Sequence, residues 1–107
     1  MHLSLVTIVV KDYDQAIDFF TGALGFDLAE DSPATTNDGR PKRWVVVRPP
    51  GAETGLLLAQ ADGAEQAASL GRQTGGRVAF FQQVGPHRRA WALISDWTAR
   101  LGQGRHD

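Results

Sequence analysis

The chain contains no cysteine. It can therefore form no disulfide, no thiolate metal ligand and no cysteine nucleophile. It also lacks an excess of either charge, because 11 Lys and Arg residues face 12 Asp and Glu residues and leave a formal net charge of −1. No strong field attracts nucleic acid or an anionic membrane surface. We expect neither of these as a partner.

Long hydrophobic runs are missing as well. No segment approaches the roughly 20 apolar residues that a membrane-spanning helix needs. The N-terminal segment MHLSLVTIVVKD has no basic start and reaches Asp12 after a short apolar run, which is unlike a signal peptide. We therefore expect a cytoplasmic protein. A length of 107 residues, with 42% hydrophobic residues, favours a single domain.

The first sixty residues predict one strand–helix–strand–strand–strand (βαβββ) module. Asp12 stands three residues before Gln15, the spacing of a helix-capping box, and Gly25 follows the apolar helical stripe as a C-terminal cap. The polar loop over 31–42 has Asn37-Asp38-Gly39 as its expected turn. The apolar patterns place a helix over 12–24 and strands over 3–10, 26–30, 43–48 and 54–60.

The remaining residues repeat only part of this order. We expect a linker over 61–76 with a short helix near 65–70, a strand over 77–81 and an amphipathic helix over 87–101. The sequence thus predicts one α+β domain over 1–107. It has a complete module at 1–60, and an incomplete second one, strand then helix, at 77–107.

Two segments resemble a known family. The run VTIVVKDYDQAIDFFTGALGF has an apolar strand, then Asp12, Ala16-Ile17, Phe19-Phe20 and Leu24-Gly25-Phe26 in the family's order. Together with RWVVVRPPGAETGLLLAQ it resembles the glyoxalase/bleomycin-resistance/extradiol-dioxygenase superfamily, the vicinal oxygen chelate proteins. The resemblance covers residues 3 to about 81. It implies a helix on one sheet face, a ligand cleft on the other, and two modules, from one or two chains, closed around a small ligand.

Many members of that family hold a divalent metal, and the resemblance places its three ligand positions at Leu5, Leu57 and Arg77. None of these side chains can bind a metal. The histidines, His2, His87 and His106, lie elsewhere and are expected on the surface. We therefore expect no metal and no other cofactor. A metal site shared between chains through His2 is the lesser alternative.

The resemblance also places candidate ligand-binding residues on the cleft face. Thr7 could orient a ligand or bond to the backbone. Trp44 could stack on a planar ligand or serve as a core or interface aromatic, and Arg48 could bind an anion or lie exposed at a strand end. No catalytic residue is identified, since Asp12 is better explained as a helix cap. The full candidate set is Leu5, Thr7, Val9, Trp44, Arg48 and Leu57.

After Phe81 the sequence departs from the family, with no acidic turn, no hairpin and no closing strands. A natural truncation or replacement and a change of reading frame both remain open. In either case a lone curved sheet leaves an apolar face and open edges, so we expect a homodimer.

Three functions follow from these expectations. The first is metal-free binding of a small molecule in a cleft formed by dimerisation. The alternatives are a metal-dependent enzyme that resembles lactoylglutathione lyase or a dioxygenase, and a non-catalytic remnant that acts only as a dimeric structural module.

Overall fold

The computed structural model describes residues 1–70 and 72–73. The chain divides into two compact units. The first unit consists of Met1–Ile8 and Asp12–Gln60, and the second of Val9–Lys11 and Ala61–Asp107. The strand expected over 77–81 and the helix expected over 87–101 lie outside the described residues.

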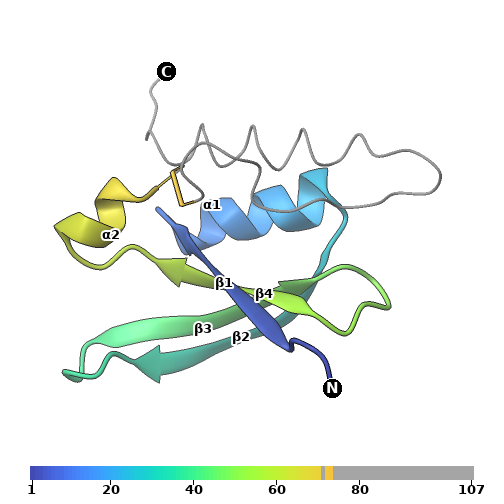
Figure 1. The fold of residues 1–107 in the computed structure, drawn as a ribbon, viewed down its shortest axis with the longest axis horizontal. Coiled ribbons are helices and arrows are strands. Elements are labelled where there is room, and N and C mark those ends of the chain that lie inside the picture. Colours follow the sequence, from blue (N-terminus) through green and yellow to red (C-terminus); the bar gives the residue numbers. More distant parts are fainter. Residues whose placement is uncertain (71, 74–107) are drawn as a thin grey trace. The chain divides into compact units, whose positions relative to one another are not determined.

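The sheet has four strands in the order β1-β4-β3-β2 (Figure 1). Neighbours β2 and β3 are antiparallel, as are β3 and β4. Along β1, the N–H of Gly55 donates to the carbonyl of Ser4 at 2.9 Å and the N–H of Ala61 to that of Val10 at 2.8 Å. Both bonds join residues equally far apart in the sequence, which is the pattern of parallel strands. The mixed sheet confirms the predicted α+β module. The bounds are β1 (Leu5–Val10), β2 (Asp27–Thr35), β3 (Pro41–Arg48) and β4 (Gly55–Gln60).

The segment 31–42, predicted as a loop, is mostly strand, so this prediction was wrong. Strand β2 runs to Thr35 and β3 begins at Pro41, with only a short turn between them. The N–H of Thr36 donates to the carbonyl of Arg40 at 2.8 Å, and Gly39 has a φ of 89°. The turn predicted at Asn37-Asp38-Gly39 is thus confirmed. The extra strand residues are exposed or half-buried and include no large apolar side chain, so cross-strand bonding extends the hairpin without an apolar signal.

The helix has two parts, α1 (Tyr13–Asp18) and a π-helical turn, η1 (Phe19–Ala23). The N–H of Gln15 donates to Asp12 Oδ2 at 2.8 Å, which confirms the predicted cap. Gly25 follows with a φ of 73°, a conformation that glycine adopts without strain. The π-turn was not predicted. Thr21 Oγ1 donates to the carbonyl of Ile17 at 2.8 Å and competes with the backbone for that acceptor.

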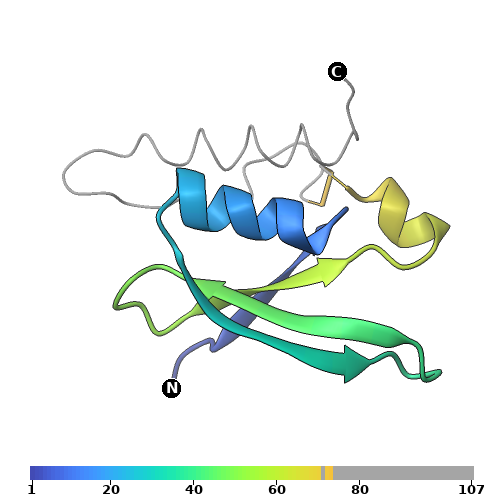
Figure 2. The same cartoon turned by 180° about the vertical axis from the view of Figure 1, so that it is seen from behind.

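Helix α1 lies across one face of the sheet (Figures 1 and 2). Phe20 is fully buried there and its ring centroid lies 5.4 Å from that of Phe26. The other buried apolar residues are Ile8, Val10, Tyr13, Ala16, Val45, Val46, Val47, Leu56 and Leu58. Val6, expected under the helix with Ile8 and Val10, is 40% exposed instead. It lies on β1, which is the edge of the sheet formed by the described strands.

The second unit contains the helix α2 (Ala64–Ala68), close to the short helix predicted near 65–70. In the same unit the side-chain amide of Gln73 bonds to both main-chain groups of Val9. The N–H of Val9 donates to Gln73 Oε1 at 2.9 Å, and Gln73 Nε2 donates to the carbonyl of Val9 at 2.7 Å. One side chain thus satisfies the backbone of an edge-strand residue. Among residues 1–70 and 72–73, no helix is long and apolar enough to cross a membrane.

Candidate functional site

The sheet has one face opposite α1, which we call the open face. Its position follows from β3, where Arg43 contacts Tyr13 of α1 through its backbone N–H and its guanidinium. Because side chains alternate along a strand, Val45 and Val47 share the side of Arg43. The open face of β3 therefore consists of Trp44, Val46 and Arg48.

Strand β4 adds Leu57 to the open face, because Leu57 pairs directly with Val46. On β1, the bond from Gly55 to Ser4 sets a parallel register that brings Thr7 beside Leu57 and Leu5 beside Gly55. Five of the six predicted ligand-binding residues therefore share one face of the first unit: Leu5, Thr7, Trp44, Arg48 and Leu57. The sixth, Val9, belongs to the second unit, where it bonds to Gln73.

Trp44 is a surface residue on this face, with 37% of its surface exposed. It pairs with Ser32 of β2 and precedes the buried Val46 by two residues. Trp44 is therefore no core aromatic in the first unit, and its exposed ring fits both a ligand contact and an interface aromatic. The hydroxyl of Thr7 is exposed and makes no hydrogen bond within the described residues, so the alternative backbone bond is absent there. Both groups are free to meet a ligand.

Arg48 is half-buried at the end of β3, and its Nε is buried without a hydrogen-bond partner in the described structure. Its neighbour in β4 is Gly55, which is also buried. A Cβ placed on Gly55 would lie 3.3 Å from Arg48 Nε and 3.1 Å from the carbonyl oxygen of Val47. The arginine side chain therefore occupies the space above a residue that has no side chain.

This packing predicts a cost for Gly55→Ala. The new methyl group meets backbone at Val47, which cannot move away cheaply, so we expect the free energy of unfolding to fall by about 1–3 kcal/mol. Gly22→Ala is the matched control, because a Cβ placed on Gly22 would meet nothing within 4 Å and its φ is not positive. Urea unfolding should show the control unchanged or up to about 1 kcal/mol more stable. Equal stability of the two variants would contradict the packing.

The family's metal positions do not assemble a ligand set here. Leu5 and Leu57 lie on the open face and offer no donor atom, and Arg77 is outside the described residues. Within residues 1–70 and 72–73, no group of three His, Cys, Asp or Glu side chains could hold a metal ion. His2 Nδ1 lies 3.2 Å from Glu53 Oε1, and both side chains are exposed. The described residues therefore do not fit a bound metal.

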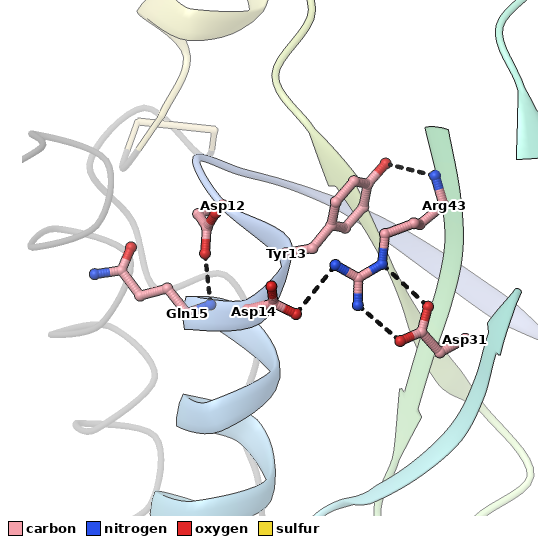
Figure 3. Close-up of polar contacts among 6 residues, drawn as sticks. All are labelled: Asp12, Tyr13, Asp14, Gln15, Asp31 and Arg43. Atoms are coloured by element: carbon pink, nitrogen blue, oxygen red, sulfur yellow. Dashed lines mark hydrogen bonds and ion pairs between the residues drawn. The ribbon is translucent and has the colours of Figure 1, made fainter. Parts of the chain in front are cut away.

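A second cluster, not predicted from the sequence, joins α1 to the sheet around Arg43 (Figure 3). Its guanidinium contacts Asp31 through two bonds, Nη2 to Oδ2 at 2.7 Å and Nε to Oδ1 at 3.1 Å, and Asp14 Oδ1 through Nη1 at 3.0 Å. Arg43 Cζ also lies 5.1 Å from the centre of the Tyr13 ring. The ion pairs link all three charged groups, so this cluster fixes the start of α1 against β2 and β3.

The cluster changes how stability depends on pH. The hydrogen bond from Arg43, followed by its charge, holds the pKa of Asp31 below the ordinary value of 3.8. A carboxylate with a lowered folded-state pKa stabilises the fold above the unfolded pKa, and the contribution is lost as pH falls through the folded value. Asp31 should therefore stabilise the protein at neutral pH, and this contribution should decline as the pH falls below about 4.

Asp31→Asn tests this dependence. At pH 7 and low salt we expect the variant to be less stable by about 0.5–1 kcal/mol, since the carboxylate is partly exposed. The difference from the unchanged protein should shrink as the pH of urea unfolding is lowered from 5 to 3. Asp27→Asn, on the same strand and outside the cluster, is the control and should show no such difference. A gap of the same size at pH 5 and at pH 3 would contradict the assignment.

Comparisons with known proteins agree with this fold. The Glyoxalase/Bleomycin resistance protein/Dioxygenase superfamily matches residues 2–101, which extends past residue 81, where the resemblance seen in the sequence ended. An uncharacterized protein of Shewanella frigidimarina (strain NCIMB 400) is 51% identical over 77 residues, 71% of this chain and 55% of that protein. This chain spans about half the length of the curated relatives it matches.

Two solved structures are similar. The crystal structure of UcmS2 has a TM-score of 0.60 at 26% sequence identity. The alignment covers 92% of this chain and 74% of the UcmS2 chain. TnmS3, described as an antibiotic binding protein from Streptomyces sp. CB03234, has a TM-score of 0.48 at 38% identity, over 56% of this chain and 46% of its own. With nearly the whole chain matched by the family, this chain belongs to the glyoxalase/bleomycin resistance protein/dioxygenase superfamily.

Proposed function

We propose that this chain binds a small, largely apolar molecule on the open face of its sheet, without a metal ion. The observation that carries the proposal is the exposed Trp44, which shares that face with Val46 and Leu57. Aromatic and aliphatic side chains with a few polar groups are the usual lining of small-molecule sites. The unbonded hydroxyl of Thr7 supplies one such polar group.

The absence of a resident metal is part of this proposal. Two of the three positions that would supply its ligands, Leu5 and Leu57, carry aliphatic side chains on the same face as Trp44. A metal there would have to displace hydrophobic contacts without gaining any N or O donor from these strands. An apolar ligand instead gains contact area from both residues.

We further propose that a second copy of the chain covers the bound molecule. Small-molecule sites commonly bury about 70–90% of the ligand surface. A single sheet face contacts only one side of a planar molecule and leaves the other in water. An identical open face from a second chain would enclose it, and the symmetry of a homodimer makes that arrangement self-complementary. Light scattering at micromolar concentration should give a dimer mass, and a monodisperse monomer would refute the dimer.

The binding proposal is tested by thermal unfolding with a panel of planar aromatic compounds of two or three rings, including 2-naphthamide. A molecule that binds only the folded state raises the melting temperature with its concentration. We expect such a rise for part of the panel, with the same size in the presence of EDTA.

The competing functions give other results. About one divalent ion per pair of chains after dialysis would support the metal-dependent lyase or dioxygenase. A stable dimer whose melting temperature responds to no compound would support a purely structural module. Either result would overturn the proposed function.

A further inference from the structure

Among the described residues, Arg48 Nε is the one buried side-chain nitrogen or oxygen without a hydrogen-bond partner. This nitrogen has neither a protein partner nor access to solvent among the described residues. A buried donor without a partner is costly, and the cost is larger for a charged group. Arg43, earlier on the same strand and on the other face, shows the contrast, because each of its three guanidinium nitrogens contacts a carboxylate oxygen.

Acidic residues near Arg48 do not supply the missing partner. Asp27 pairs with Arg48 across β2 and β3, yet the two side chains form no ion pair in the described structure. Glu30, further along β2, accepts a hydrogen bond from Ser32 Oγ at 3.0 Å. The Arg48 side chain instead lies over Gly55 on the β4 side, away from β2. The sheet therefore holds a cation on the open face and leaves its Nε donor unused.

We infer that Arg48 binds an anionic group of the ligand, so that the open face selects planar aromatic molecules that carry a carboxylate. This inference rests on the proposed function and specifies its ligand class. Trp44 and Arg48 are four residues apart on one strand, or about 13 Å between their Cα atoms. Fused rings lying over Val46 and Leu57 would reach both ends. Arginine binds a carboxylate through two parallel N–H bonds, and a small rotation of the side chain would present Nε together with a terminal nitrogen.

Two probes that differ in charge test the inference. Isothermal titration calorimetry at pH 7 and low salt would compare 2-naphthoate with 2-naphthamide, which has the same rings and no charge. We expect the naphthoate to bind about tenfold more tightly, which corresponds to about 1.4 kcal/mol. Arg48→Met keeps an unbranched apolar stem over Gly55 but removes the donors and the charge. The preference should fall to about one in this variant, through weaker binding of the naphthoate alone.

The control is Arg40→Met, which makes the same change in net charge at the exposed β2–β3 turn, where Arg40 pairs with Asp38. The Arg40→Met variant should keep an about tenfold preference for the naphthoate. This result would distinguish a direct bond from Arg48 to the carboxylate from a general effect of net charge. If the unchanged protein binds both probes equally, or if Arg48→Met keeps the preference, the inference is wrong and the proposed function stands. If neither probe binds, the inference and the proposed function are both overturned.

Discussion

Replacing Phe20 with alanine is expected to lower the free energy of unfolding by about 3–5 kcal/mol. The ring has no exposed surface and contacts the rings of Phe19 and Phe26, with centroid distances of 5.5 and 5.4 Å. It lies in the π-helical turn that connects α1 to β2. Its removal therefore leaves a cavity where the helix is held on the sheet. Urea unfolding followed by circular dichroism measures the change.

Phe19→Ala is the matched control for that variant, because Phe19 is the adjacent residue of the same type and is only half-buried. Loss of a half-buried ring removes less contact area, so we expect less than half the cost of Phe20→Ala. Since the π-turn was not predicted, this pair also tests the helix geometry. Equal losses in the two variants, or a larger loss for Phe19→Ala, would contradict the placement of Phe20 in the core.

Trp44→Ala is expected to weaken the binding of 2-naphthamide by about 30-fold, which corresponds to the cost of about 2 kcal/mol typical of a central tryptophan in a binding surface. The indole is exposed on the open face and offers the largest flat contact there. Because the side chain is not part of the core, we expect the free energy of unfolding to change by less than about 1 kcal/mol. Calorimetric titration and urea unfolding of one preparation separate these effects.

Leu28→Ala is the control for Trp44→Ala. Leu28 is also an exposed apolar residue of the sheet, but it pairs with Val47 and so lies on the side of α1. Its removal should leave the dissociation constant of 2-naphthamide unchanged within about twofold. If both variants bind equally well, the probe does not occupy the open face. If both lose binding, the effect comes from the fold and not from a contact with Trp44.

The sequence predicted the module well in the segments where the pattern of apolar side chains indicates which residues are buried. The continuous apolar runs of β3 and β4 and the cap at Asp12 each have a local cause, and the structure confirms them. The far end of the β2–β3 hairpin was missed because its strands pair through their backbone while their side chains stay in water. The π-turn was missed because the side chains of Phe19 and Phe20 are as compatible with an apolar α-helical stripe as with a π-helical turn.

The site was only partly predictable. A period of two puts Trp44, Val46 and Arg48 on one face of β3, and the register of the strands agrees with this. The packing of Arg48 over Gly55 depends on the pairing of β3 with β4, which the sequence does not specify residue by residue. The Arg43 cluster was missed for the same reason, since Asp14 and Asp31 come from a helix and a strand that only the tertiary fold brings together.

Metal-independent binding is the central claim, and a single calorimetric experiment tests it most directly. The protein would be dialysed against EDTA and then against metal-free buffer, and titrated with 2-naphthamide before and after addition of Zn²⁺, Ni²⁺ or Mn²⁺. We predict binding of the probe with the same dissociation constant in every case, since the open face offers Trp44, Val46 and Leu57 and no described metal ligand set. Binding that appears only after a divalent ion is added would contradict the account, as would no binding at all.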